Sequence, residues 1–293
     1  MKKEIRKRKG GRDMKKIISV LVVMMLVSFS GAYAALPGID LQIDLNTLDP
    51  LFVSGETDVF KRMDLNINAL STYDYSSLPA VNFTDVGEFD VTALVNDGGV
   101  LNLIENGLLG GHWNMNGNWN VAGNVSSVTP ITGGTLTEFI YSSGTFEIYV
   151  DWYKNAAGTA LVMNGTAGAV TFTQKVAELT LVSGMGHYST ADQSGAVHLV
   201  TEFSLLPVAG FWDDASDNSL DLLGQPYVFD IEVLSGSGEL IFTLIPAGPL
   251  AGFIDTIETS TTGHADLIIP EPATMLLLGS GLLGLLGFRR KKK

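Results

Sequence analysis

The feature that most constrains this chain is an alternation of apolar and polar residues with a period of two. In the segment TFEIYVDWY, the apolar positions Phe146, Ile148, Val150 and Trp152 fall on one face, and mostly polar residues take the other. A half-buried β-strand needs this alternation because successive side chains point to opposite faces of a sheet. No segment of the body shows a helical period over a convincing length.

Several further segments alternate in the same way, and Gly- and Asn-rich turns lie between them. The runs YVFDIEVL and ELIFTLI flank Ser235-Gly236-Ser237-Gly238, which predicts a hairpin. We therefore expect an all-β fold, an antiparallel β-sandwich compatible with a jelly-roll topology. An N-terminal signal helix and a C-terminal hydrophobic helix are expected to flank it. With no cysteine among 293 residues, disulfides, Cys-ligated metals and thiol nucleophiles are excluded.

The N-terminus has the pattern of a secretion signal. Residues 1–16 are basic, an apolar run covers Ile17–Phe29, and Ala32-Tyr33-Ala34 forms an A-x-A cleavage pattern. We assign residues 1–34 to a cleavable signal that uses the secretion translocon. Met14 is an alternative start, because the sequence from that residue reads as a complete signal by itself.

The C-terminus combines three elements in order. Pro270-Glu271-Pro272 precedes a 16-residue apolar stretch, Ala273–Phe288, and the chain ends on Arg289, Arg290 and three lysines. The basic cluster should stay on the cytoplasmic side, which would hold the body outside. This arrangement resembles the PEP-CTERM sorting signal of Gram-negative bacteria. The resemblance covers residues 270–293 and none of the body, residues 35–269.

That resemblance implies a destination and a partner. An exosortase, a membrane cysteine protease-transpeptidase, would recognise the tail. The protein would then reach the outer surface or the extracellular matrix after transient anchoring in the inner membrane. Because such proteins usually accompany exopolysaccharide genes, the resemblance also implies a biofilm or exopolysaccharide setting, and the body is loosely similar to flocculation-associated proteins.

The charge of the body narrows the class of partners. Between residues 35 and 269, four Lys and Arg stand against 28 Asp and Glu, a net charge of about −24. A surface this acidic repels nucleic acid and anionic lipid headgroups. It suits contact with divalent cations or neutral polymers, although acidity also serves solubility alone.

Two segments are candidate binding sites. In HWNMNGNWNV, asparagines alternate with Trp113 and Trp119, so Trp113, Asn114, Trp119 and Asn120 are candidate glycan contacts. The alternative places both tryptophans in the core and leaves the asparagines in water.

The second segment is FWDDASDNSLDLLG. Its Asp213, Asp217 and Asp221 are candidate ligands for calcium, which takes six to eight oxygens. The spacing is not that of an EF-hand, and a solvated turn is the alternative. No other cofactor is predicted.

Catalytic motifs are scarce in the body, which has no G-x-S-x-G, H-E-x-x-H or P-loop sequence. We therefore expect a non-catalytic surface or matrix protein associated with exopolysaccharide. The first alternative is a carbohydrate-binding module. The second is a polysaccharide-degrading enzyme, because a glycosidase needs only two carboxyl groups and the body has many.

Overall fold

The computed structural model describes residues 40–52, 56–74, 80–101, 111–192, 194–220, 228–235, 241–244 and 254–268. All of them belong to one compact unit, residues 38–269. The signal, the sorting tail and the two predicted flanking helices lie outside the described residues. Among the residues described, no helix has the length and apolar character needed to cross a membrane.

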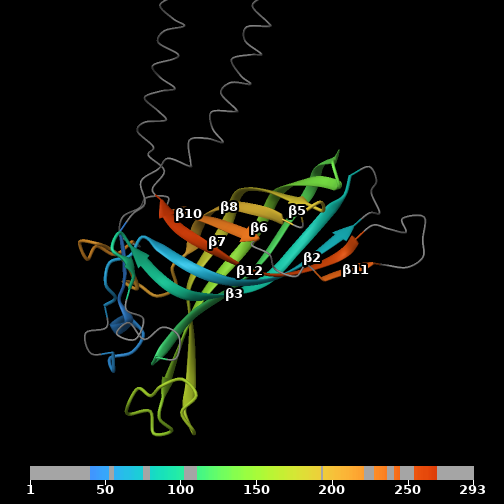
Figure 1. Ribbon diagram of the computed structural model, residues 1–293. Coiled ribbons are helices and arrows are strands. Elements are labelled where there is room, and N and C mark those ends of the chain that lie inside the picture. The colour runs from blue at the N-terminus through green and yellow to red at the C-terminus, as the bar shows by residue number, and fades with distance from the viewer. Residues whose placement is uncertain are drawn as a thin grey trace, which may run out of the picture. The chain divides into compact units, whose positions relative to one another are not determined.

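Most of the described residues lie in β-strands, and helix is nearly absent from them (Figure 1). One short 3₁₀ helix covers Leu45–Thr47. The strands are β1 (Leu41–Ile43), β2 (Arg62–Asp74), β3 (Asn82–Asn96), β4 (Gly99–Val100), β5 (Trp113–Ile131), β6 (Gly134–Lys154), β7 (Val170–Ser189), β8 (Ser194–Leu205), β9 (Trp212–Asp214), β10 (Val228–Ser235), β11 (Ile241–Leu244) and β12 (Ile254–Ile268).

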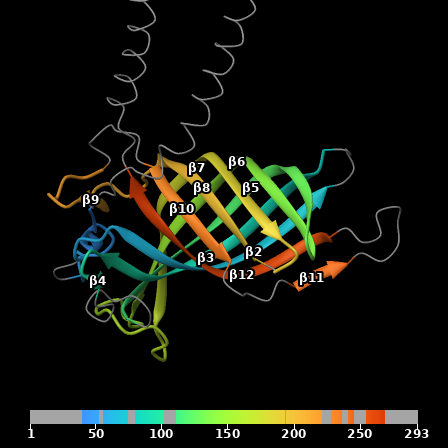
Figure 2. The same cartoon turned by 45° about the horizontal axis from the view of Figure 1, so that its top comes forward.

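Eight of these strands form a sheet that closes on itself. The hydrogen-bonded order is β2-β3-β5-β6-β7-β8-β10-β12, and β12 returns to β2, every pair being antiparallel (Figure 2). The prediction of an antiparallel all-β fold is confirmed. The arrangement differs from the predicted β-sandwich, in which two separate sheets would stack on each other. Here β10 pairs with both β8 and β12 and so joins the two ends of one sheet. Below, this ring of eight strands is called the closed sheet.

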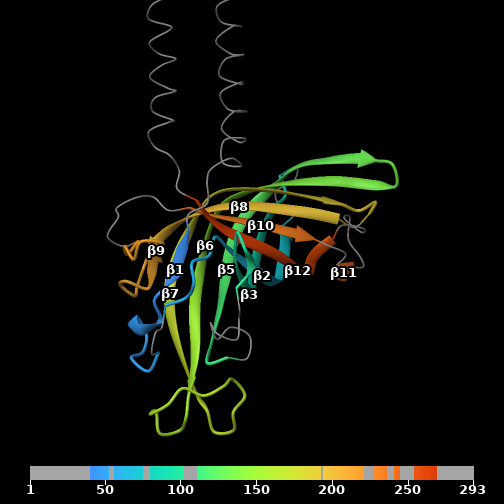
Figure 3. The same cartoon turned by 60° about the vertical axis from the view of Figure 1, so that its left-hand side comes forward.

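The curvature that closure requires coincides with irregular pairing. Register shifts interrupt the β2–β3, β5–β6, β6–β7 and β7–β8 ladders. A β-bulge bends its strand and increases the local twist, so such shifts help a long sheet to curl. Figure 3 shows the β5–β6 hairpin and the β6–β7 connection projecting from different ends of the closed sheet.

The hairpin predicted around Ser235-Gly236-Ser237-Gly238 is wrong. β10 and β11 are not hydrogen-bonded to each other, and both pair with β12 instead. β12 is 15 residues long, so residues 262–268 can pair with β10 while residues 254–258 pair with β11. β10 and β11 follow each other in the chain, but each is a neighbour of the longer strand β12 and not of the other.

The core lies inside the closed sheet and follows the predicted alternation. Phe146, Ile148, Val150 and Trp152 on β6 are all buried, as their spacing predicted. The same holds for alternate residues of β2, where Met63, Leu65 and Ile67 are buried.

The small β1–β9 sheet adds a second part to this core. Ile43 and Trp212 pair across it, and both are buried. The indole Nε1 of Trp212 donates a hydrogen bond of 3.0 Å to the carbonyl oxygen of Val176 on β7, which ties the small sheet to the large one.

Candidate functional site

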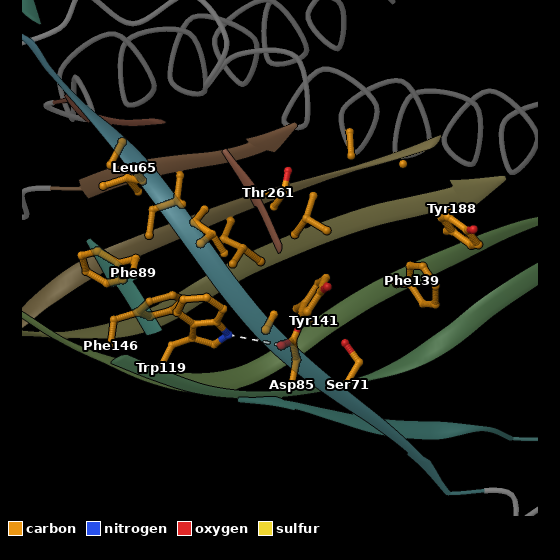
Figure 4. A pocket seen from close by; sticks show the side chains of 18 of the residues that line it. Leu65, Ser71, Asp85, Phe89, Trp119, Phe139, Tyr141, Phe146, Tyr188 and Thr261 are labelled. Atoms are coloured by element: carbon orange, nitrogen blue, oxygen red, sulfur yellow. Dashed lines mark hydrogen bonds between the residues drawn. The ribbon is translucent and has the colours of Figure 1, made fainter. Parts of the chain in front are cut away.

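The closed sheet surrounds a cavity of about 140 Å³ that is the strongest candidate for a functional site (Figure 4). Its lining is mainly apolar and aromatic and comes from strands all round the ring. Eight-stranded closed sheets have an interior just wide enough for side chains or for one small ligand. The inward residues here leave part of that interior unfilled.

One carboxyl group, that of Asp85 on β3, interrupts the apolar lining. Asp85 shares the inward face of its strand with Phe83 and Phe89, both buried. The indole Nε1 of Trp119 donates to Asp85 Oδ1 at 3.3 Å. Ser71, directly opposite on β2, also hydrogen-bonds the carboxyl group. Asp85 is deeply surrounded by protein but keeps some accessible surface, because it lines the cavity.

The surroundings of Asp85 change its acidity. Burial raises the pKa of Asp85 from 3.8 to about 6, although the hydrogen bonds from Trp119 and Ser71 act in the opposite direction. Tyr141 on β6 lies close enough to be affected in turn. Burial, followed by the nearby charge of Asp85, raises the pKa of the Tyr141 phenol well above its ordinary value. A carboxyl group with a displaced pKa in a cavity is a recognised mark of a functional site.

The aromatic side chains around Asp85 are held in fixed places. The Trp119 ring is stacked between Phe89, 6.3 Å away with an interplanar angle of 19°, and Phe146, 6.4 Å away at 27°. Two glycines make room for these rings. A Cβ at Gly87 would lie 2.3 Å from Trp119 Cζ2, and one at Gly117 would lie 2.3 Å from Phe89 Cζ. The local sequence thus positions the indole that faces Asp85.

The structure separates the two faces predicted for HWNMNGNWNV. Trp113 is buried with 2% of its surface exposed, and Trp119 lines the cavity. Asn120 points outward and is exposed, while the side-chain amide of Asn114 donates to Tyr153 Oη at 2.8 Å. Because the sheet lies between these faces, one ligand cannot contact both Asn120 and Trp119. Glycan contact by the asparagines stays a prediction, whereas Trp113 has no free ring face to offer.

The aspartate-rich loop is a tight turn in the part that is described. Asp214 Oδ1 accepts from the backbone N–H of Ser216 at 2.8 Å and from that of Asn218 at 3.0 Å. Asp217 has a φ of 59° and is exposed, Asp213 lies on β9, and Asp221 lies outside the described residues. Within the described part of the chain, no three His, Cys, Asp or Glu side chains form a metal-binding group. Calcium binding by this loop stays a prediction.

Sequence reasoning missed Asp85, although a signal was present. In the strand segment VNFTDVGEFDV, the inward positions read Phe83, Asp85, Gly87, Phe89 and Val91. A carboxyl group in the apolar register of a strand is costly unless it is paired. The position of Asp85 in the strand could therefore have identified it as a candidate functional residue. The groups that surround it come from other strands, so one strand could not predict them.

Comparison with known proteins identifies the sorting motif of the tail. Residues 269–291 match the PEP-CTERM protein-sorting motif, which confirms the resemblance seen in Pro270-Glu271-Pro272 and the segment that follows. No curated protein and no solved structure matched the chain.

Proposed function

Because the PEP-CTERM motif marks this chain as an exported protein processed by an exosortase, we propose that its body is a surface-located binding protein. The ligand would be a small, largely apolar molecule held inside the closed sheet. The observation that carries this proposal is the cavity of about 140 Å³ with its aromatic lining and single carboxyl group. An apolar pocket with few polar groups is the usual form of a small-molecule site.

The composition of the lining favours binding over turnover. A glycosidase requires two carboxyl groups on either side of the scissile bond. Among the described residues that line the cavity, Asp85 supplies one carboxyl group, and the lining is otherwise mainly apolar and aromatic. Such a lining provides burial and orientation for a ligand.

Toluene, a single-ring probe suited to the volume, tests this proposal. An apolar cavity of about 150 Å³ binds benzene, so toluene should bind the purified exported protein and raise its melting temperature. Ala69 lines the cavity from β2, so Ala69→Phe should fill it and abolish the rise. Thr84→Phe adds the same ring on the exposed side of β3 and should keep the rise. An unchanged melting temperature of the wild-type protein in saturating toluene would contradict the proposal.

A second candidate function, association with exopolysaccharide in a biofilm or floc, is favoured by the outer face of the sheet. Polar side chains stand opposite one another across neighbouring strands. The row comprises Ser260, Asn68, Glu88, Asn118, Glu147 and Glu178. Beside it, the Tyr149 hydroxyl donates to Glu147 Oε2 at 2.7 Å. Amides, hydroxyls and an aromatic ring are the groups that contact sugars.

Glycan arrays test this second candidate. Each stacked or hydrogen-bonded sugar contact is weak, so saturable binding would depend on several groups acting together. Replacing both Asn118 and Tyr149 by Ala should reduce the array signal, whereas Thr166→Ala, in the β6–β7 connection, should leave it unchanged. A protein that binds no glycan on the array, or a double variant that binds as well as the parent, would remove this candidate.

A further inference from the structure

Among the residues that the structure describes, no Lys or Arg pairs with the carboxyl group of Asp85. Residues 35–269 contain four Lys and Arg, and each pairs with carboxyl groups elsewhere. The pairs are Lys61 with Asp40 and Asp97, Arg62 with Asp64, Lys154 with Asp49, and Lys175 with Glu147 and Glu178. None of these four basic residues lines the cavity.

We propose that the cavity takes a small amphiphilic amine, with an apolar body of single-ring size and one protonated amino group that pairs with Asp85. This inference rests on the proposed function, because it names the class of ligand for that cavity. The ligand would supply the cation that none of these four basic residues brings to the cavity.

The geometry around Asp85 suits an ammonium group. The carboxyl group lies between Trp119 and Tyr141 in the lining of the cavity (Figure 4). Asp85 accepts hydrogen bonds from Trp119 and Ser71, and a carboxylate has further acceptor sites for the N–H groups of an amine. The remaining lining would bury the apolar part of the same molecule.

The energetics distinguish an amine from a neutral ligand of the same shape. A carboxylate in an apolar site is unfavourable unless an opposite charge or several donors accompany it. A neutral ring that fills the cavity removes water from the Asp85 carboxylate and forms no polar interaction in place of the lost hydration. An ammonium ion removes the same water and forms a charge-assisted hydrogen bond, which contributes about twice as much as a neutral one.

Three probes of nearly equal size test the inference: benzylamine, benzyl alcohol and toluene. With the purified exported protein at about pH 7.5, benzylamine should bind roughly tenfold to a hundredfold more tightly than benzyl alcohol by calorimetry. Asp85→Asn should abolish that preference while toluene binding persists, which also shows that the variant is folded. Asp90→Asn, on the outward face of the same strand, is the matched control and should keep the preference.

The outcomes separate this inference from the proposed function. If toluene binds but benzylamine binds no more tightly than benzyl alcohol, the amine inference is wrong and the cavity still binds ligands. If neither toluene nor benzylamine binds, the proposed function fails together with the inference. Retention of the benzylamine preference in Asp85→Asn would also overturn the assignment to Asp85.

A pH series adds a readout that packing alone would not change. Lowering the pH from about 7.5 to about 5 protonates Asp85 and should weaken benzylamine binding without affecting toluene. The other titratable groups that line the cavity are Tyr73, Tyr141, His187 and Tyr188. The dependence should be absent in Asp85→Asn. If it persists there, Asp85 is not the anchor.

Discussion

Asp85→Asn should raise the free energy of unfolding by up to about 3 kcal/mol near pH 7, and by far less near pH 4. The magnitude follows from the pKa of Asp85, which burial raises from 3.8 to about 6, at about 1.4 kcal/mol for each pH unit of displacement. Most substitutions in a core lower the free energy of unfolding. An increase for Asp85→Asn would therefore indicate that the carboxyl group serves ligand binding and not stability.

The sign of the pH dependence follows from which state holds the proton more tightly. Below about pH 3.8, Asp85 is protonated in both the folded and the unfolded chain, so it does not lower the free energy of unfolding. Between pH 3.8 and about 6, the unfolded chain loses the proton while the folded protein retains it, so stability falls as the pH rises. Above about pH 6 the loss is complete. An asparagine at this position cannot ionise and is spared that loss.

Urea denaturation of the exported protein at pH 4, 5, 6 and 7 would measure this difference. Asp90→Asn, outward on β3, serves as the control and should show no comparable gain. A decrease in stability of Asp85→Asn at pH 7 would mean that the carboxylate is better accommodated in the folded protein than its burial indicates.

Lys154→Met should lower the free energy of unfolding by about 3 kcal/mol at pH 7, because it leaves a buried carboxylate without its counter-ion. Lys154 Nζ pairs with Asp49 Oδ2, and Asp49 is 5% exposed. Trp152 Nε1 donates to the same oxygen at 3.2 Å. The ammonium group also lies 4.9 Å from the centre of the Phe172 ring. The methionine would fill similar space but supply no charge.

The loss should shrink in acid. Burial by itself would raise the pKa of Asp49, but hydrogen bonds from Lys154, the Leu51 N–H and Trp152 outweigh it and leave that pKa below its ordinary value. The stabilisation is therefore present above the ordinary pKa and disappears as the pH falls through the lowered one. Wild type and Lys154→Met should therefore converge only once the pH has fallen below this lowered pKa, which lies under 3.8.

Lys61→Met is the matched control for this second experiment. Lys61 also pairs with aspartates, at 3.7 Å from Asp40 and 2.5 Å from Asp97, but the Asp97 side chain is 82% exposed. Water screens such a pair, so its removal should change the unfolding curve little. Equal losses for the two variants would show that burial of the Asp49 pair has no special effect.

The sequence by itself determined the features that depend on neighbouring residues. Alternation along single strands predicted the antiparallel all-β class and the burial of Phe146, and it placed Trp113 on the face opposite to Asn118 and Asn120. Pro270-Glu271-Pro272 and the residues after it established the sorting motif, which residues 269–291 match. These features are local, because a strand sets the direction of each side chain by its position alone.

Only the tertiary structure decided which strands are partners and what lies inside them. The pairing of β12 with β2 joins residues that lie 184 to 204 positions apart, and together with the β10–β12 pairing it closes the ring. No local pattern specifies it. The pairing of β12 with β10 took the place of the predicted β10–β11 hairpin. The neighbouring order of β2, β3, β5 and β6 places Ser71, Asp85, Trp119 and Tyr141 around one cavity. Periodicity predicts the face of a strand on which a side chain lies. A binding site depends also on which strands are neighbours, and long-range pairing determines those neighbours.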